Sequence, residues 1–207
     1  MSNKSKREII CPNCAQGQKV TLYTGINNIQ NPELKDRILK EDIFDFKCKG
    51  CGYKAQLVYP LIFIDSRNSY VIAFCPVQTE EELETDEKIS SFTKRKVKNI
   101  AELKEKIMIF DNHLNDLAIE MVKNSFVGIF RNKYQNTDIQ MYFSHVDTRE
   151  DLTFAIFVGD EKRAVYEKVN FMVYKQSAEV LRSIAYQEKD EFLRVDTATV
   201  KILTGEK

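Results

Sequence analysis

Glycine, histidine and long apolar runs are scarce in this sequence, and each scarcity removes a class of function. There are only seven glycines, two of them beside one cysteine pair, and no glycine-rich phosphate-binding loop of either common type occurs. The sequence also lacks the Gly-x-Ser-x-Gly and His-Glu-x-x-His motifs of hydrolases and zinc proteases. Its longest apolar stretches, such as residues 70–75 and 154–158, fall well short of the roughly 18 residues that span a bilayer. No catalytic motif and no contact with the membrane are therefore predicted.

Net charge is also absent. Lysine and arginine number 31, as do aspartate and glutamate, so the formal charge of the 207-residue chain is zero. A dedicated nucleic-acid-binding protein usually carries a basic excess, so this balance argues against one. The hydrophobic content of 43% and aromatic content of 11% are typical of a folded globular protein with one or two domains.

Cysteine carries the clearest signal. Two Cys-x-x-Cys pairs, Cys11/Cys14 and Cys48/Cys51, are separated by 33 residues. Two intervening residues let one tight turn direct both sulfurs at one ion, and zinc takes four thiolates at tetrahedral corners. Strand-like sequence flanks both pairs, so the pattern predicts a zinc ribbon with a structural Zn²⁺ ion. Because such pairs are usually about 15–20 residues apart, the ribbon must contain an insertion.

Disulfides, redox chemistry and iron are the alternatives for these cysteines. The first eight residues are polar and basic and do not resemble a signal peptide, which predicts a cytoplasmic protein, where disulfides are rare. A redox motif would be a single pair at the start of a helix rather than two pairs followed by strands. Four-thiolate zinc is the preferred interpretation, and such a site has no open position for a substrate.

The sequence around these cysteines resembles the CpXC domain family. The resemblance rests on Cys11-Pro-Asn-Cys14, Asn31-Pro-Glu-Leu34, residues 44–48, residues 59–61 and the segments 102–110 and 114–117. It covers roughly residues 8–130. The second pair departs from the Cys-Pro-x-Cys motif because Lys49 replaces proline, which leaves the ligands unchanged. The family is functionally uncharacterised, so the resemblance implies the domain and the four cysteine ligands and no catalytic residue.

The predicted fold class is α+β. A zinc ribbon with an inserted short helix and antiparallel strands comes first, followed by a helical pair and a small α+β C-terminal unit. The insertion helix is expected to begin at Asn31, as a capping residue, and Pro32. Strands are expected at 8–10, 19–24, 43–47, 55–59, 61–64 and 70–74, and helices at 99–110 and 114–129. A polar stretch at 131–137 suggests domains at 1–130 and 131–207.

In the C-terminal domain we expect strands at 139–143, 152–158, 163–174 and 192–195. Ser177 is expected to open a helix that runs to Tyr186, and Asp196 to cap a short helix that ends at Leu203. An acidic run at 80–87 and a basic run at 94–98 are interpreted as solvated, the latter on an edge strand. A docking patch for a partner is the alternative for these two runs.

Few residues outside the cysteine pairs are chemical candidates. Cys75 is expected to be a small buried hydrophobe. His113 lies between two predicted helices, where capping or solvation is favoured over a role as ligand or base. By strand parity His145 is expected at the rim of a core face, and Asp147 and Asp151 follow it closely. A proton-transfer pair is the alternative for that group.

Three functions follow in order of preference. The first is a zinc-stabilised adaptor that binds another protein. The second is a nucleic-acid-binding protein that uses basic residues around the ribbon, with Tyr53 available for stacking. These residues are Lys4, Lys6, Arg7, Lys47, Lys49 and Lys54. The third is an enzyme with its site around His145, Asp147 and Asp151. The sequence names no partner, pathway or oligomeric state.

Overall fold

The computed structural model describes residues 3–76 and 89–205. By internal contacts the chain divides into two compact units, residues 1–100 with 190–192, and residues 101–189 with 193–207. The mixed α+β class predicted from the sequence is confirmed, with the four cysteines in the N-terminal region. The predicted helical pair lies in the second unit, whereas the expected first domain, residues 1–130, included it. The domain boundary near residue 130 stays a prediction. No helix among the described residues is both long and apolar enough to cross a membrane.

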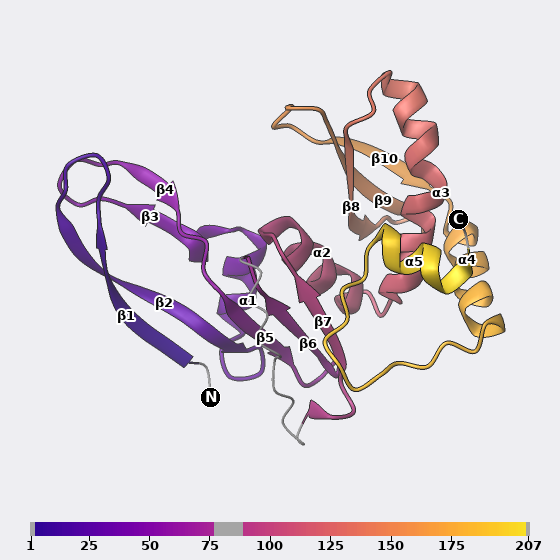
Figure 1. Ribbon diagram of the computed structural model, residues 1–207, viewed down its shortest axis with the longest axis horizontal. Coiled ribbons are helices and arrows are strands. Elements are labelled where there is room, and N and C mark those ends of the chain that lie inside the picture. Colours follow the sequence, from indigo (N-terminus) through magenta and orange to yellow (C-terminus); the bar gives the residue numbers. More distant parts are fainter. Residues whose placement is uncertain (1–2, 77–88, 206–207) are drawn as a thin grey trace. The chain divides into compact units, whose positions relative to one another are not determined.

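A five-stranded sheet forms the centre of the first unit (Figure 1). Its strands, in spatial order, are β1 (Asn3–Ile10), β2 (Gly17–Asn27), β5 (Leu61–Asp65), β6 (Tyr70–Phe74) and β7 (Thr93–Val97). The pairs β1/β2 and β5/β6 are antiparallel, as expected for this region, whereas β2/β5 and β6/β7 are parallel. Parallel neighbours need a long crossover connection. The insertion between the cysteine pairs supplies most of the crossover from β2 to β5.

That crossover contains helix α1 (Pro32–Leu39), a 3₁₀ turn at Asp42–Phe44 and the two-stranded ribbon of β3 (Asp45–Lys47) and β4 (Lys54–Gln56). The predicted helix start is confirmed, with Asn31 at the N-cap position and Pro32 in the first turn. The Asn31 side chain makes no capping bond, however, and its amide donates to Glu33 instead. Leu34 and Ile38 bury the apolar face of the helix.

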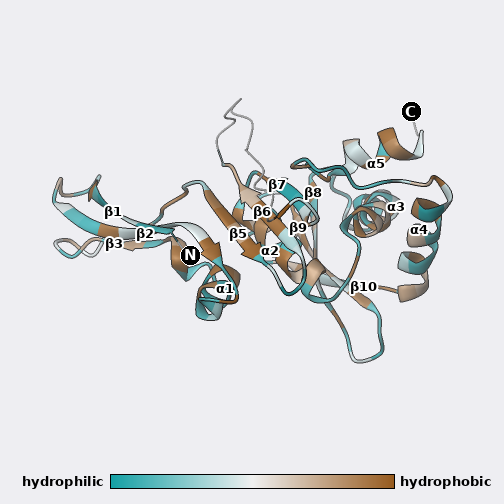
Figure 2. Cartoon of the chain, turned by 90° about the horizontal axis from the view of Figure 1, so that it is seen from below, coloured by the Kyte–Doolittle hydropathy of each residue, from teal (hydrophilic) through white to brown (hydrophobic). Residues whose placement is uncertain are grey.

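Strands β5 and β6 supply many buried residues to the core of the first unit, and both are strongly hydrophobic in Figure 2. Every residue of β6 is buried, and the Phe74 ring packs edge-on against Phe44. Cys75 is buried directly after β6, as predicted, and burial raises the pKa of its thiol. An inert apolar role for Cys75 follows from these two facts.

The basic run falls on β7, an edge strand as predicted, but its solvation was wrongly predicted at two positions. Lys94 and Arg95 are fully buried. The Lys94 ammonium donates to the Ser90 carbonyl and forms an ion pair with Asp190, and the Arg95 guanidinium donates to the Lys94 carbonyl. A buried charge requires such partners. The acidic run at 80–87 lies outside the described residues.

The second unit is built on a three-stranded antiparallel sheet in the order β10 (Val165–Val169), β9 (Leu152–Val158), β8 (Ile139–Val146). Its helices are α2 (Ile100–Asp111), α3 (Asp116–Tyr134), α4 (Phe171–Ser183) and α5 (Thr197–Thr204). Phe143, Phe154 and Ile156 of the sheet and Ile119 and Val122 of α3 share one core. α3 runs to Tyr134, through most of the stretch that was predicted to separate two domains.

Two predicted elements of this unit were wrong. The segment 163–174 is not one strand, because β10 ends at Val169 and the Asn170 side chain accepts a bond from the Met172 N–H, which starts α4 six residues before Ser177. Residues 192–195 form no strand of their own. The predicted cap at Asp196 is confirmed, since its carboxylate accepts from the Thr199 N–H.

Candidate metal centre

The first cysteine pair occupies a tight turn between β1 and β2. The Cys11 N–H donates to the Gln16 carbonyl at 3.0 Å, and the Ala15 N–H donates to the Cys11 carbonyl at 2.9 Å. Pro12 and Asn13 form the tip between the two cysteines. The turn is therefore held by two backbone hydrogen bonds of Cys11, one donated and one accepted.

The second pair repeats this pattern between β3 and β4. The Cys48 N–H donates to the Tyr53 carbonyl at 2.8 Å, and the Gly52 N–H donates to the Cys48 carbonyl at 3.0 Å. Gly52 adopts a positive φ of 74°, and Ala15 occupies the equivalent position of the first turn with a φ of 58°. The two turns thus share one backbone conformation, and only the second has the residue that adopts it without strain.

The four sulfurs converge. The Sγ atoms of Cys11 and Cys51 are 3.7 Å apart, those of Cys14 and Cys48 are 3.6 Å apart, and all four lie within 4.8 Å of one another. A disulfide would require about 2.05 Å. Sulfurs about 2.3 Å from one tetrahedral zinc ion are about 3.8 Å apart. The four predicted cysteines are therefore together and close enough to bind one metal ion, and two of their S–S distances match a tetrahedral site.

A small core supports the cluster from one side. Cys11 and Cys48 are buried with Phe46, against which Ile9, Val20 and Leu57 pack. Cys14 and Cys51 are exposed. The β3–β4 ribbon lies beside the β1–β2 hairpin, and the cysteine turns are at the same end of both (Figure 1). Each Cys-x-x-Cys pair thus contributes one buried and one exposed cysteine.

Two amide side chains connect the halves. Asn13 of the first turn donates to the Cys51 Sγ at 3.4 Å. Gln18 of β2 donates to the Lys47 carbonyl at 3.0 Å and accepts from the Lys49 N–H at 2.8 Å. Sequence reasoning missed both residues. An amide inside or just after a cysteine turn is too common to single them out.

The hydrogen bonds also differentiate the thiols. The Asn13 amide and the Tyr53 N–H lower the pKa of Cys51 to about 6. The N–H groups of Cys51 and Gly50 lower the pKa of Cys48. The Gln16 N–H acts to lower the pKa of Cys14, but the neighbouring thiols and burial outweigh it and raise that pKa to about 12. The metal-free cluster therefore retains at least one proton at neutral pH.

Both histidine candidates belong to the second unit, whereas the four cysteines belong to the first. His113 is exposed in the turn between α2 and α3 with a φ of 54°. A bulge in β8 between Phe143 and His145 reverses the strand parity, so His145 is exposed rather than at the rim of the core, and its Nδ1 lies 3.1 Å from the Ser144 hydroxyl.

Asp147, the first carboxylate after His145, is held by Lys168 and by its own turn. The Asp147 carboxylate pairs with Lys168 at 2.6 Å and accepts the N–H groups of Arg149 and Asp151. The Lys168 ammonium and these N–H groups lower the pKa of Asp147 to about 2. Asp147 therefore acts as a turn-forming carboxylate that stays ionised.

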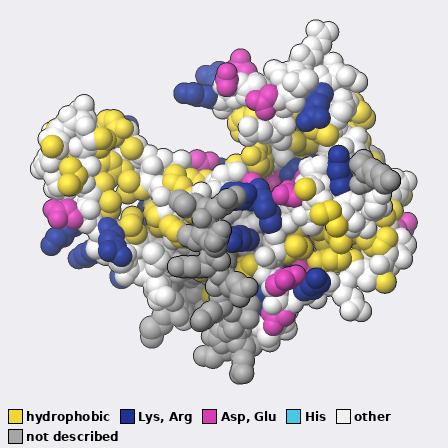
Figure 3. Space-filling model, viewed as in Figure 1, with side chains coloured by type: hydrophobic (Ala, Val, Ile, Leu, Met, Phe, Trp, Pro, Cys, Tyr) yellow, Lys and Arg dark blue, Asp and Glu magenta, His cyan; other side chains and the backbone are white. Residues whose placement is uncertain are grey.

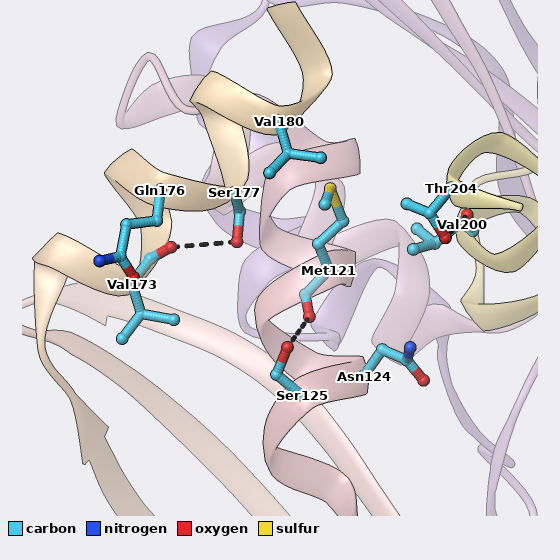
Figure 4. A pocket seen from close by; sticks show the side chains of 9 residues that line it. All are labelled: Met121, Asn124, Ser125, Val173, Gln176, Ser177, Val180, Val200 and Thr204. Atoms are coloured by element: carbon cyan, nitrogen blue, oxygen red, sulfur yellow. Dashed lines mark hydrogen bonds between the residues drawn. The ribbon is translucent and has the colours of Figure 1, made fainter. Parts of the chain in front are cut away.

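The second unit contains a small pocket among α3, α4 and α5 (Figure 4). Its volume is about 230 Å³, below the roughly 300 Å³ at which drug-sized ligand sites begin. Met121, Val173, Val180 and Val200 give it an apolar lining. The hydroxyls of Ser125, Ser177 and Thr204 each donate to a carbonyl of their own helix. The pocket thus offers no hydroxyl hydrogen that is free to bind a ligand.

Comparison with known proteins identifies one family. The sequence model of the family described as CpXC protein matches residues 9–123, more than half of the chain. The matched region contains all four cysteines and agrees with the resemblance seen in the sequence. No curated protein and no solved structure matches the chain.

Proposed function

The chain belongs to the CpXC protein family, and from this membership and the cysteine cluster we propose that it is a zinc protein whose ribbon binds another protein. The observation that carries the proposal is the convergence of four cysteine sulfurs, all within 4.8 Å of one another, from two matched turns. Thiolates favour zinc, and four of them fill its coordination shell, so the ion stabilises the fold and has no position left for a substrate.

Charge around the cluster supports a bound divalent ion with four thiolates. Lys47 and Lys54 are directly opposite each other in the β3–β4 ribbon, and Lys49 lies in the turn between them. Like charges in opposite positions destabilise a strand pair. Four thiolates on Zn²⁺ carry a net charge of about −2, which offsets that repulsion. Thiolates must also stay reduced to bind zinc, so we place the protein in a reducing compartment such as the cytoplasm.

Exposed apolar side chains beside the cluster favour a protein partner. Ile10, directly before Cys11, is 69% exposed, and Tyr53, after the second turn, is 38% exposed. Apolar and aromatic side chains of this kind supply the anchors of protein interfaces. They lie on the same rigid tip that the metal would hold together.

Metal content provides the first test of this proposal. Protein purified without added metal should contain one zinc per chain by elemental analysis. Cobalt substitution should give the absorption of a tetrahedral four-thiolate site. A chain with less than a tenth of an equivalent of metal, even after refolding with zinc, would refute the metal centre.

The interface is tested separately. A tagged chain is used to capture partners at low salt, with half of each eluate treated with nuclease. Ile10→Asp with Tyr53→Ala should lose a protein that survives nuclease treatment. Ile202→Asp, at an 81% exposed position of α5, is the control and should retain it. Equal capture by both variants would contradict an interface at the ribbon tip.

Nucleic acid is the second candidate, because charge is segregated along the neutral chain. Residues 3–27 and 45–56 contain seven cations and two acids. The cations are Lys4, Lys6, Arg7, Lys19, Lys47, Lys49 and Lys54, and the acids are Glu8 and Asp45. Figure 3 shows lysine and arginine side chains on the lobe that these hairpins form. The strand register places Lys4, Lys6 and Lys19 on one face of the β1–β2 hairpin.

Anisotropy of a labelled single strand distinguishes this candidate from the first. Three phosphate contacts would give a slope of about −2 for log affinity against log salt. Lys4→Glu and Lys6→Glu should each weaken binding, and together they should abolish it. Lys201→Glu on the exposed face of α5 is the charge-matched control for each single variant. Binding that is absent at low salt would eliminate this candidate and leave the protein partner.

A further inference from the structure

The two halves of the cysteine cluster rest on supports of very different strength. The first turn joins β1 and β2, which pair over eight positions. The second turn joins β3 and β4, which are three residues long and pair at three positions. An isolated two-stranded ribbon is marginal in water. The second turn therefore needs support from outside its own ribbon if its sulfurs are to stay in place.

Gln18 provides that support from the stronger half. It lies in β2 opposite Ile9, so its backbone is fixed by the β1–β2 ladder. Its side chain bonds to the carbonyl before Cys48 and to the N–H after Cys48. Both groups therefore face the Gln18 side chain. One side chain thus makes two hydrogen bonds of the kind that a neighbouring strand would make. These bonds fix the backbone on both sides of Cys48.

A primary amide is suited to make both bonds at once, because it carries a donor and an acceptor on neighbouring atoms. The Gln18 amide nitrogen donates to the Lys47 carbonyl while its oxygen accepts from the Lys49 N–H. A carboxylate of the same size has no hydrogen to donate, and an aliphatic side chain makes neither bond. The chemistry of the side chain, beyond its size, is what this position uses.

We propose that Gln18 is a positioning residue for the metal site, which holds Cys48 in the ligand geometry before the ion binds. This proposal rests on the proposed function, since it assumes that the cluster takes up a metal. Groups that orient metal ligands from outside the coordination shell typically change metal affinity 10- to 100-fold when they are replaced. We expect the same range for Gln18.

The test measures cobalt and zinc affinity of the full chain by competition with a chromophoric chelator. Gln18→Ala removes both bonds, and Gln18→Glu keeps the size and the acceptor but loses the donor. Gln56→Ala is the matched control, because Gln56 lies in β4 and its amide donates to Glu41 at 3.2 Å, away from the cysteine turns. Both Gln18 variants should lose affinity about 10- to 100-fold, while Gln56→Ala stays within twofold of wild type.

A second measurement examines the metal-free state directly. Alkylation of each thiol is followed by mass spectrometry in chelator. Cys48 should react faster in Gln18→Ala than in wild type, with the rate of Cys11 unchanged, because Cys11 is held by its own half. A general loss of folding would accelerate both thiols equally and count against the proposal.

The outcomes separate the two proposals. A wild-type chain that binds no metal overturns both. A wild-type chain that binds one ion, with both Gln18 variants within twofold of it, overturns the positioning role and leaves the zinc function intact. If Gln18→Glu matches wild type and only Gln18→Ala is weak, Gln18 acts through packing, and the hydrogen-bond proposal is wrong.

Discussion

Replacing Gly52 with alanine should destabilise the ribbon, although the new methyl group would contact nothing. A Cβ at this position has no heavy atom within 4 Å, so packing contributes neither gain nor clash. The cost comes from the backbone, whose φ is 74°. Left-handed backbone costs an alanine about 1–2 kcal/mol, and the reduced freedom of the unfolded chain returns about 0.4–1 kcal/mol. The expected net loss is about 1 kcal/mol in the free energy of unfolding.

Ala15 allows the same reasoning to be tested with the opposite sign. It occupies the equivalent position of the first turn with a φ of 58°, so Ala15→Gly should stabilise the ribbon by about 1 kcal/mol. Gly128 within α3 is the control. Its Cβ would also meet no atom within 4 Å, but helical backbone favours alanine, so Gly128→Ala should stabilise by about 1 kcal/mol.

The assay is urea unfolding at saturating zinc, followed by circular dichroism and tyrosine fluorescence. Gly52→Ala should then lower the urea midpoint and Gly128→Ala should raise it, although an added Cβ meets no atom within 4 Å at either position. If Gly52→Ala stabilises the protein as Gly128→Ala does, the positive φ of the second turn is refuted. The inferred equivalence of the two cysteine turns would fail with it.

Three further predictions concern separate parts of the chain. Cys48→Ser should lose the metal and unfold the ribbon while the second unit keeps its helical circular dichroism, and a variant that retains one equivalent of zinc would show the ligand set to be wrong. Glu105→Ala should destabilise by about 1–3 kcal/mol in urea unfolding, because it leaves the buried Phe143 N–H without its acceptor while Lys123 keeps its ion pair with Glu120, and a loss below about 0.5 kcal/mol would contradict this. Asp147, whose folded pKa is about 2, contributes stability above about pH 4 that is lost as the pH falls toward 2. In Lys168→Met, carbon-detected NMR should find that pKa raised toward its ordinary value, and an unchanged pKa would exclude the ion pair as the cause.

The parts of the structure that the sequence predicted are those determined by short-range chemistry. Three local signals each concern residues within one turn of chain. They are the two residues between paired cysteines, the proline after Asn31 and the acidic residue before residues 197–204. The cluster, the start of α1 and the start of α5 follow from them. The sequence also predicted β5 and β6, because their apolar residues and the turn between them are contiguous.

The rest depends on partners that are distant in sequence or on one inserted residue. Lys94 reads as a solvated cation because Asp190, the carboxylate that allows its burial, lies 96 residues further along the chain. His145 changes face because a single bulge shifts the register of β8, and no local pattern marks that position. The capping asparagine at 170 was overlooked because the apolar residues around it fit a strand as well as a helix.

The position of the cysteine turns predicts a role for a bound metal in holding the first unit together. The crossover from β2 to β5 is long, and joining its ends loses entropy that grows with its length. The parallel contact that it must bring together consists of three residue pairs, Gly25/Ile62 to Asn27/Ile64. The first cysteine turn lies directly before β2, and the second lies within the crossover. An ion bound by both turns would therefore tie the crossover to the start of β2. Metal removal should therefore weaken the β2/β5 pairing as well as the ribbon. Hydrogen exchange of the β2 and β5 amides with and without chelator measures this, and unchanged protection would confine the role of the metal to the cysteine turns.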